Sequence, residues 1–278
     1  MPGANARALD KAQTLDCDGL IFDLEDAVAP AAKDQARNQV VAALNTNDYA
    51  HRERIVRINP LASTWGEADL QACCELAQID GLLIPKVEQA ADIERVVAAL
   101  AGGEQPLLPI WLMIETPLGV LELAHLAGVS ERVAGLIVGT SDLVQELHAQ
   151  HSPERDALRY ALSHILLVGR AHNLVVLDGV PLDFRDLAGL RASNQQGRTM
   201  GFDGRTLIHP GQIALTNEVY GLSPEDIQHA EKVWRAWTQA SAAGKGVVEV
   251  DGSLVENLHA RDAQRVLAMA EAIAARET

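Results

Sequence analysis

The chain has 278 residues, of which 48% are hydrophobic, and a formal net charge of −15. A chain of this length can bury a large core and suits one α/β barrel better than two small domains. Its negative charge disfavours nucleic acid and anionic membrane surfaces as partners, so we expect a small-molecule substrate. We find no uncharged apolar stretch of membrane-spanning length and no apolar core of a secretion signal, so we expect a cytoplasmic protein.

Short apolar segments alternate with amphipathic ones, as expected for a parallel sheet covered by helices. In chain order, the expected strands are GLIFDLE (19–25), RIVRIN (54–59), GLLIPK (81–86), PIWLMIE (109–115), GLIVG (135–139), LVVLDG (174–179) and TLIH (206–209). Apolar residues recur at intervals of three and four over 33–45, 89–102 and 154–173, which predicts helices there. Seven units are one short of a complete barrel, but no glycine-rich phosphate fingerprint follows the first strand. We therefore favour a β/α barrel over a doubly wound sheet.

The composition changes near residue 241. We expect a barrel over 1–240 and a C-terminal piece over 241–278, in which glycines punctuate KGVVEVDGSLVEN (245–257). This glycine-rich segment is a candidate mobile lid. The pattern of 261–277 then predicts a final helix.

Polar residues gather where the expected strands end. They are Asp23, Glu25 and Asp26 after the first strand, Arg57 and Asn59 after the second, Lys86 after the third and Glu115 after the fourth. Active sites of parallel barrels are assembled at this carboxyl edge from several strand ends. The alternative interpretation is that charged residues simply resume where burial stops.

Glu115 and Asp142 follow consecutive strands, which are neighbours in a barrel. Two carboxylates suit Mg²⁺, which takes its remaining ligands from water and substrate, and no His/Cys set favours zinc. The alternative is that one of them caps the following helix. Arg57 offers paired donors to a substrate carboxylate or carbonyl, or it forms a salt bridge to Glu25 or Asp26. His209 also follows an expected strand and is a weaker candidate for the site.

Several long motifs follow one another in order: IFDLEDAVAPAAKDQAR, VRINPLASTWGEADL, LLIPKV, WLMIETPLG, IVGTSDL and MGFDGRTLIHPGQI. On these motifs the chain resembles the citrate lyase β-subunit-like family of HpcH/HpaI aldolases and citrate lyases, which includes malyl-CoA and citramalyl-CoA lyases. The resemblance extends from Pro2 to about Glu256. It implies a (β/α)8 barrel that uses Mg²⁺, with Mn²⁺ as the alternative ion, to cleave or form 3-hydroxyacyl thioesters. It also implies a homotrimer or hexamer.

The resemblance also implies roles for individual residues. The family's metal ligands correspond to Glu115 and Asp142 in this sequence. Its substrate contacts correspond to Arg57 and Ser141. The family's contacts to the CoA thioester correspond to Asn5, Lys11, Ile208 and His209.

The chain departs from the family pattern in two places. The family has a strand before its PG motif, whereas this sequence reads MPG at its start, so we expect a truncated or missing first strand. The family lid carries an acid/base Asp that often acts in a neighbouring subunit, whereas the matching run here, GSLVE, has Glu256. Asp251 in the adjacent VDG is the second candidate.

Among the family's substrates we expect (S)-citramalyl-CoA, cleaved to acetyl-CoA and pyruvate, with malyl-CoA as a close alternative that differs by one methyl group. One other interpretation is a citrate lyase β subunit that acts on citryl-acyl carrier protein. A further one is a non-catalytic acyl-CoA-binding paralogue, which the departures motivate.

Overall fold

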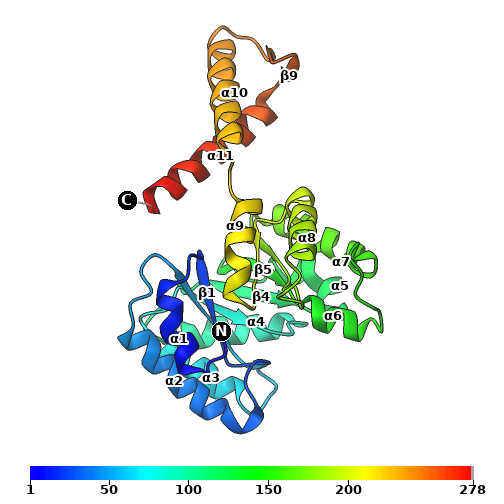
Figure 1. The fold of residues 1–278 in the computed structure, drawn as a ribbon. Helices are drawn as coiled ribbons and strands as arrows, with labels where there is room; N and C mark the ends of the chain where they lie inside the picture. Colours follow the sequence, from blue (N-terminus) through cyan, green and yellow to red (C-terminus); the bar gives the residue numbers. More distant parts are fainter. Residues whose placement is uncertain (277–278) are drawn as a thin grey trace. The chain divides into compact units, whose positions relative to one another are not determined.

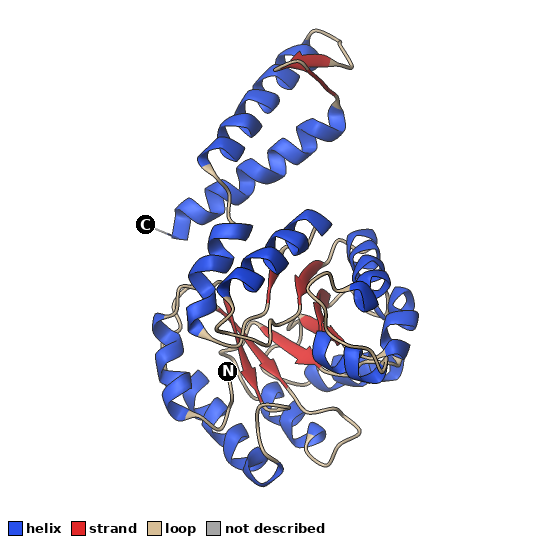
Figure 2. Ribbon diagram, turned by 45° about the vertical axis from the view of Figure 1, so that its right-hand side comes forward, coloured by secondary structure: helices blue, strands red, loops and turns tan. Residues whose placement is uncertain are grey.

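The computed structural model describes residues 1–276, and seven parallel strands pair in chain order within it to form one curled sheet (Figures 1 and 2). The strands are β1 (Gly19–Asp23), β2 (Glu53–Arg57), β3 (Gly81–Ile84), β4 (Ile110–Ile114), β5 (Val133–Val138), β6 (Val175–Asp178) and β7 (Gly204–Arg205). The expected parallel α/β architecture is confirmed. The number of strands and their order along the chain are also as predicted.

Helices connect successive strands and lie outside the sheet (Figure 2). The helices of this part are α1 (Ala6–Lys11), α2 (Lys33–Thr46), α3 (Gly66–Cys74), α4 (Ala90–Leu100), α5 (Pro117–Leu126), α6 (Thr140–Glu146), α7 (Arg159–Ala171), α8 (Leu187–Met200) and α9 (Ile213–Tyr220). Four 3-10 turns add to them: η1 (Ala12–Thr14), η2 (Pro30–Ala32), η3 (Asp156–Leu158) and η4 (Pro210–Gln212). The three predicted amphipathic segments form α2, α4 and α7, with η3 at the start of the third.

The two faces of the sheet have separate cores. Most buried apolar side chains lie between the sheet and its helices, whereas Ile55, Leu83, Trp111, Met113 and Ile137 form a second cluster on the other face. Because side chains alternate along a strand, residues two positions beyond this inner cluster also point inward. The polar residues at the carboxyl edge therefore lie next to the apolar cluster of the inner face.

The seventh strand differs from its expected position at TLIH (206–209). The strand is Gly204–Arg205, and the backbone N–H groups of Ile208 and His209 both donate to the side-chain oxygen of Gln212, at 3.1 Å each. Pro210 then begins η4, and proline has no N–H for a sheet ladder. Local side-chain hydrogen bonds therefore replace strand pairing in this segment.

The free edge of β1 carries only a short additional pairing. Pro2 forms a single parallel bridge with Asp23, supported by hydrogen bonds from Gly3 N to Asp23 O and from Asp23 N to Met1 O, both 2.8 Å. α9, which follows β7, is tied to the segment before β1 by the side chain of Asn217, which donates to Asp16 O at 2.9 Å. The single bridge between Pro2 and Asp23 therefore stands where a truncated first strand was expected.

The described chain forms two compact units that divide after Tyr220. The expected boundary between residues 240 and 241 lies instead within α10 (Pro224–Ala242). The second unit consists of α10, an antiparallel hairpin of β8 (Val248–Val250) and β9 (Ser253–Val255), and α11 (Asn257–Arg276). The helix predicted over 261–277 thus begins four residues earlier, and residue 277 lies outside the described residues. Within residues 1–276, no helix combines the length and apolar character needed to cross a membrane.

Candidate active site

The carboxyl edge of the sheet brings the predicted strand-end residues together. Asp23 lies two residues after Ile21, Arg57 two after Ile55, and Glu115 follows Met113 by the same interval, so all three side chains point to the inner face. Asp23 and Arg57 are also direct partners in the register of β1 and β2. The interpretation that charge merely resumes at solvent does not fit, because Asp23, Glu25 and Glu115 are buried.

Arg57 is bound by carboxylates on the neighbouring strand end. Its Nε and Nη2 donate to the two oxygens of Asp23 at 2.7 and 2.5 Å, and its Nη1 lies 2.9 Å from Glu25 Oε2. Nη1 also contacts the Met113 sulfur at 3.4 Å. Burial opposes ionisation of Asp23, but hydrogen bonding and charge attraction from Arg57 lower the pKa of this carboxyl. The salt bridge considered as an alternative for Arg57 is therefore present, with Glu25 as the nearer of the two expected partners.

Glu115 and Asp142 both approach the ammonium of Lys86. Lys86 Nζ lies 4.0 Å from Glu115 Oε1, 3.5 Å from Asp142 Oδ1 and 2.5 Å from Glu25 Oε1. The backbone N–H of Lys86 donates to Glu115 Oε1 at 2.9 Å. Burial raises the pKa of Glu115 to about 8, and the charges of Glu25 and Asp142 act in the same direction. The expected pair of carboxylates thus shares one cationic neighbour.

Neither carboxylate serves as a helix cap. The side chain of Thr116, rather than Glu115, caps α5 by accepting from Gly119 N at 3.0 Å. The N-cap of α6 is Gly139, which has no side chain to form a cap, and Asp142 lies within the first turn. The alternative capping role considered for these residues is therefore not observed.

Gly139 makes room for Glu115 at the end of β5. A Cβ atom on Gly139 would lie 2.3 Å from Glu115 Cβ and 2.5 Å from its Oε2, distances that real side chains do not adopt. The absence of a side chain at position 139 therefore allows the glutamate to lie against the neighbouring strand end. Ser141, half-buried, is adjacent to Asp142 in the first turn of α6.

The donors present fit Mg²⁺ as a site with two protein ligands. No cluster of three or more His, Cys, Asp or Glu side chains with metal-binding geometry occurs among residues 1–276. Mg²⁺ does not need such a cluster, because it keeps several waters and takes ligands from the substrate. Glu115 and Asp142 supply the hard oxygen donors, and burial is the main cause of the raised pKa of Glu115.

The residues expected near the CoA thioester have local structural roles. Asn5 caps α1 by accepting from Ala8 N at 3.2 Å, and Lys11 lies in the last turn of the same helix. His209 Nδ1 accepts from Gly211 N at 3.0 Å. The exposed imidazole of His209 stacks on the Phe184 ring with their centroids 4.8 Å apart, and Ile208 is also exposed.

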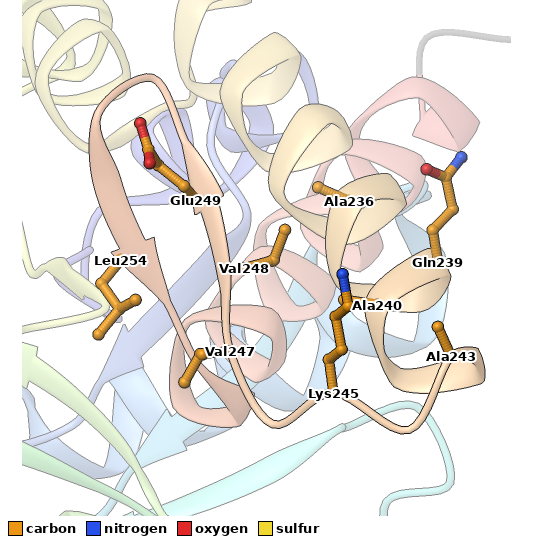
Figure 3. Close-up of a pocket in the computed structure, with 9 residues that line it drawn as sticks. All are labelled: Ala236, Gln239, Ala240, Ala243, Lys245, Val247, Val248, Glu249 and Leu254. Carbon is orange, nitrogen blue, oxygen red and sulfur yellow. The ribbon is translucent and has the colours of Figure 1, made fainter.

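The two candidate acid/base carboxylates lie in the second unit. Asp251 has a positive φ of 51° in the turn between β8 and β9 and forms an ion pair with Lys232. Glu256 precedes α11, and its N–H donates to His259 Nδ1 at 3.0 Å. The pocket drawn in Figure 3 belongs to this unit and is formed by α10, the following loop and both strands of the hairpin; neither Asp251 nor Glu256 lines it.

A second charged cluster, which the sequence did not reveal, lies at the ends of β6 and β7. Asp178 is fully buried and binds Arg155 Nη1 through both oxygens at 2.7 Å and Arg205 Nη2 at 2.6 Å. Burial, together with the charge of Asp178, raises the pKa of Tyr220 to about 12. The available signal was Asp178 itself, a carboxylate directly after the apolar residues VVL.

Comparisons with known proteins identify relatives of this chain. A family model described as HpcH/HpaI aldolase/citrate lyase matches residues 1–210. A protein named (3S)-malyl-CoA thioesterase from Cereibacter sphaeroides is 48% identical, covering 99% of this chain and 94% of the relative. Citrate lyase subunit beta from Escherichia coli is 35% identical, covering 100% of this chain and 93% of the relative.

A solved structure of similar fold contains ligands. The crystal structure of protein CitE from Mycobacterium tuberculosis in complex with magnesium, acetoacetate and coenzyme A aligns with a TM-score of 0.76 at 29% identity. The alignment covers 96% of this chain and 95% of that protein.

Proposed function

Because this chain belongs to the HpcH/HpaI aldolase/citrate lyase family, we propose that it is a Mg²⁺-dependent carbon–carbon lyase acting on a 3-hydroxyacyl-CoA thioester. The observation that carries the proposal is the convergence of Glu115 and Asp142 on one cationic position, next to Arg57 and its carboxylate partners. The magnesium and coenzyme A bound in the similar CitE structure support the same ligands here.

Glu115 and Asp142 would hold the metal, and Mn²⁺ could take the same oxygen donors. When bound, the metal supplies Lewis-acid polarisation of substrate oxygens. Ser141, adjacent to Asp142, would contact the substrate at the start of α6. The cleaved carbon–carbon bond leaves its electron pair on the thioester fragment as an enolate, while the hydroxyl of the other fragment releases its proton to solvent water and becomes a carbonyl.

Arg57 stabilises the negative charge that develops on the thioester oxygen. Its guanidinium is held by Asp23, which fixes the orientation of the group before the substrate arrives. A donor that is already oriented costs no reorganisation during the reaction, and this makes electrostatic stabilisation effective. Nη1, which faces Glu25 and Met113 and is not bound to Asp23, is the nitrogen that would donate to the substrate.

Glu256 or Asp251 would protonate the enolate carbon to give acetyl-CoA. Replacing each carboxylate by its amide, Glu256→Gln and Asp251→Asn, removes the proton donor with little change in shape. In D2O, the variant that lacks the donor should no longer exchange deuterium into added acetyl-CoA, and the other should retain this exchange. Retention in both single variants and in the double variant would contradict this role.

We also propose that the protein is a homotrimer or hexamer in which the second unit completes a neighbouring subunit's site. Light scattering measures the size of the assembly. Mixing inactive Glu115→Ala protein with an inactive lid-carboxylate variant should restore part of the activity, because mixed oligomers combine an intact metal site with an intact lid. An active monomer would contradict the proposal.

Asn5, Lys11, Ile208 and His209 are the proposed CoA contacts. They lie in α1 and in the segment before η4. The exposed Ile208 side chain and the stacked Phe184–His209 rings offer an apolar surface next to a polar one. Such a surface suits a thioester arm, which is apolar between its amide groups.

The substrate proposed from sequence is (S)-citramalyl-CoA, and the 48% identical relatives named for malyl-CoA make malyl-CoA an equal candidate. Their name also favours a second activity, hydrolysis of the thioester to the free hydroxy acid and CoA. The products distinguish the two reactions. A lyase releases acetyl-CoA with pyruvate or glyoxylate, whereas a thioesterase releases free CoA with citramalate or malate.

The test incubates purified protein with citramalyl-CoA and malyl-CoA, in Mg²⁺ and then in EDTA. Acetyl-CoA should form with Mg²⁺ only, and the variants Glu115→Ala and Asp142→Ala should form none. Glu67→Gln is the matched control, since Glu67 pairs with Arg95 in an exposed ion pair. Full activity of either metal-site variant would refute the metal site. Activity on citryl-acyl carrier protein alone would favour the citrate lyase β subunit, and inactivity on every thioester would favour a non-catalytic binding protein.

A further inference from the structure

The side chain of Lys86 lies among four carboxylates from three parts of the carboxyl edge. Its ammonium hydrogen-bonds Glu25 Oε1 at 2.5 Å. It lies 3.5 Å from Asp142 Oδ1, 3.7 Å from Asp26 Oδ1 and 4.0 Å from Glu115 Oε1. Burial alone would lower the pKa of Lys86, but the hydrogen bond that Lys86 donates to Glu25 and the charge of Glu115 raise it.

The backbone at Lys86 has an unusual conformation. Its φ is +50°, in the left-handed region that side chains other than glycine, asparagine and aspartate rarely adopt. Such strain persists only where the surrounding structure holds it in place, and it is concentrated at functional positions. Lys86 lies two residues after the end of β3, with Pro85 between them.

The ion pairs of the cluster contain more carboxylates than basic side chains. Its ion pairs join five carboxylates, those of Asp23, Glu25, Asp26, Glu115 and Asp142, to the basic side chains of Arg57 and Lys86. Arg57 is engaged by Asp23 and Glu25. The ion pairs recorded for Glu115 and Asp142 both go to Lys86.

We propose that Lys86 is the internal counter-ion of the metal site: its ammonium lies against the carboxyl groups of Glu115 and Asp142 in the metal-free protein, and Mg²⁺ displaces it from Asp142. The inference rests on the metal site of the proposed function and adds a role for a residue outside the ligand pair. Two cations cannot share these carboxylates without repulsion, because Coulomb energies rise steeply at about 4 Å in a partly buried site. Lys86 has a flexible stem and keeps Glu25 and Asp26 as partners after it moves.

This role has two opposite consequences. Without metal, Lys86 stabilises the fold by reducing repulsion among the carboxylates. With metal, it weakens binding because it competes for the same oxygens. A residue that simply supports the shape of the site would do the reverse, since its loss would weaken metal binding.

The test compares wild-type protein with Lys86→Met, which replaces the side chain by an unbranched one that is one atom shorter and uncharged. Thermal unfolding in EDTA should give a lower Tm for Lys86→Met, and calorimetric titration with MgCl₂ should give a Kd roughly tenfold or more below the wild-type value. Lys86→Arg, which keeps the charge, should bind Mg²⁺ close to the wild-type Kd. Lys245→Met, an exposed change in the second unit, controls for loss of a surface charge.

An unchanged or weaker Mg²⁺ affinity in Lys86→Met, or a metal-free Tm equal to that of wild type, would overturn the inference. If Lys86→Met does not fold, Lys86→Gln, which keeps a hydrogen-bond donor for Glu25, allows the same two measurements. Wild-type protein that binds no Mg²⁺ would instead refute the metal site of the proposed function. The two failures are therefore distinguishable.

Discussion

Arg57 and Asp23 are joined by two hydrogen bonds, Nε to Oδ1 at 2.7 Å and Nη2 to Oδ2 at 2.5 Å, across the paired ends of β1 and β2. Asp23 also accepts the backbone N–H groups of Glu25 and Ala27, at 2.8 and 3.1 Å. The aspartate therefore orients both the arginine and the turn that carries Glu25.

We expect Arg57→Lys to lower kcat/KM on the substrate thioester by about 10²-fold or more, as when one preorganised donor is removed from a charge-stabilising site. Lysine keeps the charge but has no planar pair of donors for Asp23. Steady-state kinetics measures the loss. The matched control is Arg54→Lys, because Arg54 is on the same strand and binds Asp80 in a similar two-oxygen pair. Wild-type kcat/KM in Arg57→Lys would contradict the role.

The metal-free protein should lose stability as the pH rises from about 4.5 to about 8. In this interval the folded protein keeps a proton on Glu115, whose pKa is raised to about 8 by burial, whereas the unfolded chain, with the ordinary value of 4.5, has released it. The folded state binds more protons, so the free energy of unfolding falls with rising pH. Urea unfolding in EDTA at pH 6 and pH 8 measures the effect.

Glu115→Gln provides the control for that pH dependence, since it cannot titrate. Its loss of stability between pH 6 and pH 8 should be smaller than that of the wild type. Identical losses in the two proteins would show that the Glu115 carboxyl is not the group responsible.

Gly139→Ala should weaken Mg²⁺ binding about 10- to 100-fold, the range found when a neighbour that orients a metal ligand is altered. The added Cβ would lie 2.5 Å from Glu115 Oε2 and would push the carboxylate away from its position. Calorimetric titration measures the Kd. Gly102→Ala is the control, because the nearest atom to its Cβ would be 3.9 Å away. Equal affinities in both variants would contradict the argument.

Asp178→Asn should lower the free energy of unfolding by about 3–5 kcal/mol, because it leaves two buried arginines without their shared carboxylate. Both partners are buried or nearly so, with Arg205 exposed by 2% and Arg155 by 11% of the side chain. Glu67→Gln, which breaks an exposed pair, should cost less than about 1 kcal/mol. Urea unfolding of both variants gives the comparison, and similar losses would mean that Asp178 is not a structural anchor.

The fold could be predicted from the sequence wherever burial alone determines the pattern. Continuous apolar runs such as IWLMI (110–114) are typical of strands that are buried on both faces in a covered parallel sheet. Their ends then mark one edge of the sheet, which is why Glu115 and Asp142 were predicted as neighbours. The seventh strand was misplaced because TLIH (206–209) has the same apolar character, but the side chain of Gln212 takes its backbone donors.

The ion pairs within the site could not be predicted in the same way. Arg57 meets Asp23 because the two residues are partners in the strand register, and the short apolar runs of β1 and β2 contain no clear alternation from which this register can be inferred. Arg155, which binds Asp178, has a positive φ of 54°. Helical periodicity in the sequence does not reveal this backbone conformation. Partner choice depends on these three-dimensional details.

Glu115 accepts its hydrogen bond from the main-chain N–H of residue 86, a group that every amino acid except proline provides. Substitution of the side chain leaves this bond available, so residue 86 makes two separable contributions to the site. The peptide orients the glutamate, and the side chain sets the local charge. Metal affinity can therefore be tuned at this position, by selection or by design, without moving the ligand that binds the metal.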